Sequence, residues 1–264
     1  MQEIAFITTG FAVGLIVGLT GVGGGGSLMT PILIFGFGIQ PALAVGTDLL
    51  FAAGTKAGGL VQLVRQKRVP WRVVFHLSLG SIPASLATLY VLNHWGTQHP
   101  QTQKMITLTL GISLLLTAAS TLYKAIRGVR HPLIQDTQTE LSSIKHRPFF
   151  LPILFGALIG TLVTLTSVGA GAIGVTAFML LYPALSLHRI IAADIAYAVP
   201  LTLVAGLGHA SLGSVNWTLL GLLLTGSLPG IWLGSHWVSK APERLIRSFL
   251  SVLLAWAGTK LVLV

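Results

Sequence analysis

Three charged side chains lie where apolar residues otherwise dominate the sequence. Asp48 and Asp194 each stand inside a long apolar stretch, and Lys56 follows Asp48 by eight residues. Eight residues are about two turns of an α-helix, so Asp48 and Lys56 would share roughly one helix face. An ionised group near the bilayer centre costs on the order of 2.5–3.5 kcal/mol, so such groups normally face a cavity or a partner and mark a transport path. We interpret Asp48 and Asp194 as residues that couple transport to protons, and Lys56 as a positive charge for an aspartate or a bound anion.

A structural interpretation of the same residues stays open. Each aspartate could cap or bridge a neighbouring glycine-rich segment through backbone N–H groups, and Lys56 could extend to the interface or close a buried ion pair. His76 and His209 could relay protons, but an isolated histidine is more often a hydrogen-bonded packing residue.

Two glycine-rich breaks interrupt apolar segments. Residues 21–26 read GVGGGG and residues 167–172 read SVGAGA. Glycine weakens a helix by about 1 kcal/mol relative to alanine, so neither run is predicted to continue one. At membrane depth a broken backbone is tolerated only where protein buries it or where it lines a polar cavity. New helices are therefore expected near Ser27 and Ile173, and their N-termini would present N–H groups and a positive dipole end to an anion.

Glycine-rich runs of this kind have two further uses in proteins. Close packing of small residues between helices would also use glycine. A phosphate-binding P-loop would need a lysine after the last glycine, and none follows Gly26. Hydroxyl groups near the breaks could donate to an oxyanion, and they belong to Thr20, Ser27, Thr30, Thr47, Thr166 and Thr176. The predicted substrate-binding residues are Gly23, Gly24, Gly25, Gly26, Ser27, Thr47, Lys56, Gly169, Ala170 and Gly171.

The composition excludes an ordinary soluble domain. Of 264 residues, 53% are hydrophobic and 8% are charged, whereas a soluble domain carries about a quarter charged residues. The sequence predicts an all-α, polytopic helical membrane protein with about 8–10 membrane helices. The net charge of +10 comes from basic islands between apolar runs, as the positive-inside rule predicts for cytoplasmic loops, and so does not indicate nucleic-acid binding. No enzyme motif, cysteine or metal-ligand cluster is found, so we expect no enzymatic activity, cofactor or metal.

One offset of 146 residues relates the two halves of the chain without gaps. It maps Asp48 to Asp194, Trp71 to Trp217 and Gly80–Pro83 to Gly226–Pro229. Such self-similarity is typical of transporters built from repeats. The predicted plan is a first repeat at 1–127, a basic cytoplasmic linker at 128–148 and a second repeat at 149–264. Each repeat holds a broken segment and three helices, at 4–39, 42–64, 71–92 and 104–126, and at 149–185, 188–210, 216–238 and 245–263.

The loop charges predict that the repeats have opposite orientations. The loop after Arg65 is basic, whereas its equivalent at 211–216 carries no charge. In the second pair of equivalent loops, 239–249 is the basic one and 93–103 is at most weakly basic. Equivalent loops would then lie on opposite sides, which requires an odd number of crossings per repeat. Each broken segment would enter and leave on one side as a hairpin of two short helices, and both chain ends would lie outside.

A family resemblance rests on the first broken segment and the apolar stretch after it. The run GLTGVGGGGSLMTPILIFGFGIQPALAVGTDLLFAAGTKAGGLVQLVRQKRVPWR resembles the sulfite exporter TauE/SafE family, also called TSUP permeases. The resemblance covers nearly the whole chain, with the second half as a degenerate copy. It implies secondary transport of sulfite, thiosulfate, sulfonates or related anions. Asp48, where the family commonly has a small hydroxyl residue, and Lys56 depart from the pattern.

The predicted function is a proton-coupled secondary carrier for a small sulfur-containing anion, in the cytoplasmic membrane. The open alternatives are an uptake permease that feeds a cytoplasmic enzyme and a passive, channel-like membrane subunit. The expected partners are the anionic substrate, the lipid bilayer, and either a second copy of the chain or a cytoplasmic sulfur-handling protein.

Overall fold

The regular elements of the described residues are helices, as the composition predicts. The protein is described by a computed structural model that covers residues 2–20, 27–127, 150–169, 171–183, 185–237 and 243–263. The predicted linker and residues 21–26 fall outside these ranges. The helices are α1 (Gln2–Thr20), α2 (Met29–Phe37), α3 (Pro41–Arg65), α4 (Trp71–Trp95), α5 (Pro100–Arg127), α7 (Phe150–Thr166), α8 (Ala172–Leu181), α9 (Leu187–Ser211), α10 (Trp217–Trp237) and α11 (Glu243–Leu263).

Within the described residues, six helices are long and apolar enough to cross a bilayer: α1, α4, α5, α9, α10 and α11. The chain is therefore a multi-pass helical membrane protein. The 25 residues of α3 would also be long enough, at about 1.5 Å each, but Asp48 and Lys56 interrupt its apolar character. α2 has 9 residues and α8 has 10, so each is far shorter than the roughly 20 residues that a crossing needs.

The helix boundaries follow the prediction closely, with one error. Adding 146 to the bounds of α3, 41 and 65, gives 187 and 211, which are the bounds of α9. The second break occurs where expected, and the helices that follow the two glycine-rich runs begin at Met29 and Ala172. The prediction that each broken segment is a hairpin of two short helices was wrong for the helix before each break, because α1 has 19 residues and α7 has 17. Nothing in their apolar sequence stops a helix before the breaks.

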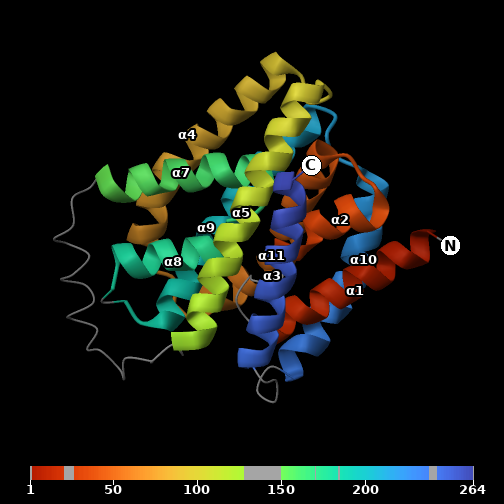
Figure 1. Ribbon diagram of the computed structural model, residues 1–264. Coiled ribbons are helices and arrows are strands. Elements are labelled where there is room, and N and C mark those ends of the chain that lie inside the picture. The colour runs from red at the N-terminus through yellow and green to blue at the C-terminus, as the bar shows by residue number, and fades with distance from the viewer. Residues whose placement is uncertain are drawn as a thin grey trace.

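The helices of the two halves pack on each other reciprocally. α1 lies along α10, and its counterpart α7 lies along α4, the counterpart of α10. α5 packs against α11 and α3 against α9, so these two pairs join equivalent helices. Figure 1 shows α5 and α11 side by side, with α1 and α10 on one side of them and α4 and α7 on the other.

Glycines let α1 and α10 approach closely. A Cβ atom on Gly10 or Gly14 of α1 would overlap the backbone of Leu223 or Ser227 in α10, and one on Gly226 would overlap α1. Without a hydrophobic force between helices in lipid, such close backbone packing is a main source of association. Small-residue packing is thus present in this protein, at glycines outside the two breaks.

Two glycines of α10 give a matched test of this packing. Gly226→Ala would push a Cβ against the carbonyl oxygen of Ile7, whereas nothing lies within 4 Å of a Cβ on Gly221. Overpacking costs about 1–3 kcal/mol, so we expect Gly226→Ala to lower the melting temperature in detergent by several degrees. Gly221→Ala should leave it unchanged or raise it. Equal effects of the two variants would contradict the packing of α1 on α10.

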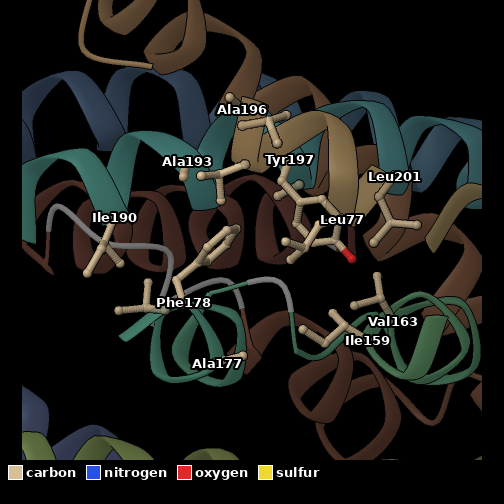
Figure 2. Packing of buried hydrophobic residues seen from close by; sticks show 14 of the residues in the cluster. Leu77, Ile159, Val163, Ala177, Phe178, Ile190, Ala193, Ala196, Tyr197 and Leu201 are labelled. Carbon is tan, nitrogen blue, oxygen red and sulfur yellow. The ribbon is translucent and has the colours of Figure 1, made fainter. Parts of the chain in front are cut away.

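The largest apolar core surrounds α9. It joins residues of α3, α4, α7, α8 and α9, and Figure 2 shows Phe178 of α8 and Tyr197 of α9 within it. Their rings meet edge to face, with centroids 6.1 Å apart and planes at 83°, an arrangement that aromatic pairs favour. This core therefore fixes α8 against α9 and sets where the polar residues of α9 lie.

Candidate anion site between the broken helices

The side chain of Asp48, a residue of α3, lies beside the start of α2, the helix that follows the first glycine-rich run. The backbone runs through a turn of 3₁₀-helix at Ser27 and Leu28. The N-cap residue Leu28 makes no side-chain hydrogen bond to the backbone N–H groups at the start of α2. Instead, the Thr30 hydroxyl donates a hydrogen bond to Asp48 Oδ2, and the Thr30 backbone N–H also contacts this carboxylate. Asp48 is completely buried on α3. A carboxylate from another helix thus meets the positive dipole end of α2.

Asp194 occupies the equivalent place at the start of α8. It is the eighth residue of α9, as Asp48 is of α3, since 194 − 187 and 48 − 41 both equal 7. Its Oδ1 atom lies so close to Gly174, the third residue of α8, that a Cβ there would overlap it. Asp194 is also buried. Each half of the chain therefore places one carboxylate against the beginning of its own short helix.

Lys56 provides a positive charge shared by both carboxylates. It is half-buried on α3 and interacts electrostatically with Asp194 and Asp48. With both aspartates ionised, these three groups carry a net charge of −1. A single proton on either carboxylate would make the three groups neutral together, and an added anion would then be repelled less.

The second break reaches the start of α2. Ser167 adopts a left-handed backbone conformation, with φ of 58°, and its side chain lies beside the Asp48 carboxylate. Val168 shares a buried apolar cluster with Leu28 and residues of α5 and α11. The Thr166 hydroxyl holds the break in shape, because it bonds the Leu162 carbonyl at 2.6 Å and accepts from the Val168 N–H at 3.1 Å.

Two further hydroxyls adjoin this arrangement. Tyr197 is fully buried on α9, with its phenol near Asp194 and near the buried hydroxyl of Ser81 on α4. In Figure 2 the ring of Tyr197 extends from α9 toward Val163 of α7, with its oxygen at the tip. We call these connected residues the central polar cluster: Thr30, Asp48, Lys56, Ser81, Ser167, Asp194 and Tyr197.

Comparison with known proteins identifies the family. The family model of the sulfite exporter TauE/SafE matches residues 6–261. The chain belongs to the TauE/SafE family. It is 34% identical to the probable membrane transporter protein YjnA of Bacillus subtilis, over 99% of this chain and all of that protein. It is 25% identical to YunE and 24% identical to YdhB, two probable membrane transporter proteins of the same organism, over at least 96% of each chain. No solved structure matches it.

The TauE/SafE fold brings together only part of the predicted binding set. Ser27 is buried at the start of α2, Gly171 is the N-cap of α8, and the carbonyl of Gly169 accepts a hydrogen bond from the Gly174 N–H at 2.8 Å. The Thr47 hydroxyl instead serves a loop contact, because it donates to Leu43 O at 2.7 Å and accepts from the Asn216 N–H at 3.1 Å. Gly23, Gly24, Gly25, Gly26 and Ala170 lie outside the described residues.

His209 makes the packing contact that isolated histidines usually make. It is buried, and its Nε2 atom lies 2.9 Å from the Thr164 carbonyl oxygen. Thr164 in turn donates to the Ser85 hydroxyl at 2.7 Å, so this chain of contacts ties α9 to α7 and α4. Over the part of the chain that the structure describes, no group of three or more acidic, histidine or cysteine residues could hold a metal ion.

Tyr197 and Ser81 belong to the cluster although the sequence did not single them out. The repeat offset contained a signal for Tyr197, because 197 − 146 gives 51, where the first half has Phe51. Tyr197 therefore differs from its counterpart in the first half of this TauE/SafE protein by a single hydroxyl group. Ser81 carried no such signal, since its counterpart Ser227 is also a serine.

Proposed function

We propose that the protein is a proton-coupled secondary carrier for a small sulfur-containing anion such as sulfite, thiosulfate or an organosulfonate. The observation that carries the proposal is the position of Lys56, which interacts with two buried carboxylates at equivalent positions of α3 and α9. Buried ionisable groups in membrane-spanning proteins usually mark substrate or proton paths. The TauE/SafE family and the three membrane transporter relatives support transport as the activity.

The proposed architecture is two inverted repeats, at 1–127 and 149–264. The reciprocal packing of α1 on α10 and of α7 on α4 supports a two-fold relation between the halves. The loop charges favour an axis in the membrane plane over one along its normal, because equivalent loops differ in basic residues. In the cytoplasmic membrane this arrangement would place the basic linker inside and both chain ends outside.

In the proposed mechanism the anion binds beside Lys56, between the starts of α2 and α8. Proton binding to Asp48 or Asp194 would bring the local charge from −1 to zero, so that the anion is not repelled by two carboxylates. Hydroxyls of the central polar cluster would donate hydrogen bonds to the anion's oxygens. Rocking of one half against the other would then open the site to either side.

Anion flux into proteoliposomes tests the coupling role of Asp48. We expect flux of sulfite or thiosulfate in the wild-type protein to rise with an imposed pH gradient. Asp48→Asn removes the titrating group but keeps its size, so it should abolish the gradient dependence and leave anion exchange intact. Asp194→Asn is the matched variant from the other half.

The same measurement separates the carrier from other activities. A flux that ignores the pH gradient in the wild-type protein and in both variants would contradict proton coupling and would assign a passive, channel-like pathway. Running the assay with the gradient in either direction distinguishes export from uptake. An absence of flux for every sulfur anion tested would contradict the proposed substrate class.

A further inference from the structure

We infer that the hydroxyls of Tyr197 and Ser81 are substrate ligands that donate hydrogen bonds to an oxyanion held near Lys56. This assignment rests on the proposed function and deepens it, because it names two specificity-determining residues and the kind of ligand that they select. The substrate would be an anion with several acceptor oxygens, such as sulfite, thiosulfate or a sulfonate, in preference to a halide.

Both hydroxyls are buried without the hydrogen bonds that such burial demands. Tyr197 and Ser81 have no solvent exposure, and neither oxygen makes a hydrogen bond of acceptable geometry with any residue that the structure describes. The two groups nevertheless lie close to each other. A buried hydroxyl without a partner carries the full cost of its lost hydration, so native proteins rarely keep one that has no role.

The repeat shows that packing alone does not require the Tyr197 hydroxyl. The equivalent residue of the first half is Phe51, which is also buried. Ser227, the counterpart of Ser81, uses its hydroxyl within its own helix by donating to the Leu224 carbonyl at 3.3 Å. A ring without a hydroxyl therefore fits this environment. Among the described residues the pair of unsatisfied donors, with Ser81 from the first half and Tyr197 from the second, has no equivalent at Ser227 and Phe51.

The charges around the pair favour an anion as the missing acceptor. Tyr197 lies one turn from Asp194 on α9 and near its carboxylate, and Asp194 interacts with Lys56, which also interacts with Asp48. An oxyanion held by Lys56 beside Asp194 would lie near both hydroxyls. Tyrosine and serine hydroxyls can each donate one hydrogen bond, and bonds to a charged acceptor are about twice as strong as neutral ones.

The test compares anion binding and stability in single-atom variants of the purified protein. Tyr197→Phe is expected to weaken binding of sulfite or thiosulfate about ten- to a hundredfold, the effect of losing one hydrogen bond to a charged group. The melting temperature without anion should stay the same or rise, because an unsatisfied hydroxyl is removed. Ser81→Ala should act in the same direction. Tyr182→Phe, which removes another buried phenol hydroxyl outside the cluster, is the control and should leave binding unchanged.

The outcomes separate this inference from the proposed function. Equal anion affinity in wild type, Tyr197→Phe and Ser81→Ala would overturn the ligand role and leave the carrier function standing. A lower melting temperature of Tyr197→Phe without anion would also overturn it, because the hydroxyl would then have a structural partner. No binding of sulfite, thiosulfate, sulfate or methanesulfonate to the wild-type protein would overturn the proposed function itself. Chloride binding that is as strong as oxyanion binding would overturn the stated selectivity.

Discussion

Lys56→Met is expected to reduce anion flux in proteoliposomes to the level of protein-free vesicles. The substitution keeps a long, flexible side chain but removes the ammonium group that interacts with Asp48 and Asp194. The two buried carboxylates would then lack this counter-charge, and an anion would meet negative groups. Breaking a buried ion pair by removing one partner costs about 3–5 kcal/mol; Lys56 is half-buried, so the loss of stability should lie at or below the lower end.

A charge-balanced double variant separates folding from transport at this position. Lys56→Met combined with Asp48→Asn leaves one carboxylate, so its net charge of −1 equals that of the wild-type group. We expect the double variant to regain most of the melting temperature and none of the flux. Lys56→Arg keeps the charge and should retain measurable transport. Substantial flux through Lys56→Met would contradict a role for Lys56 in holding the anion.

Gly174→Ala is expected to produce the second large effect, through Asp194. A Cβ at position 174 would overlap the Oδ1 atom of Asp194, so the carboxylate would have to leave the start of α8. Overpacking of this kind costs about 1–3 kcal/mol. Because the displaced carboxylate would also lose its place beside Lys56, we expect anion flux to fall at least tenfold. Thermal unfolding and flux in the same preparation measure the two effects.

Shortening Asp194 tests whether the effect of Gly174→Ala passes through that side chain. In the double variant Gly174→Ala with Asp194→Ala the clash is gone, so the stability loss of the two changes should be less than additive. Flux should stay low because the carboxylate is absent. Additive stability losses would show that position 174 and Asp194 do not meet, which would contradict the geometry at the start of α8.

The sequence alone determined the class of the protein and most of its helices. Its low charge content and long apolar runs required helices that satisfy their own backbone hydrogen bonds in lipid. The glycine-rich run at 167–172 predicted the end of α7 at Thr166, because glycine weakens a helix wherever it accumulates. The offset of 146 residues located α9 from α3 to the residue. Asp48, Lys56 and Asp194 were singled out because charge inside an apolar stretch is expensive.

The tertiary structure decided what these residues contact. No local pattern says that Asp48 meets Thr30 of α2 and Ser167 of the other half, or that Lys56 interacts with Asp194 as well as Asp48. These contacts depend on how α3 packs on α9 and on where the second break lies. Thr47 was predicted to bind substrate as one of the hydroxyls near the breaks, and its hydroxyl accepts a hydrogen bond from Asn216 at the start of α10. Helix formation is governed by neighbours along the chain, but the partner of a buried polar group is set by helices that are distant in sequence.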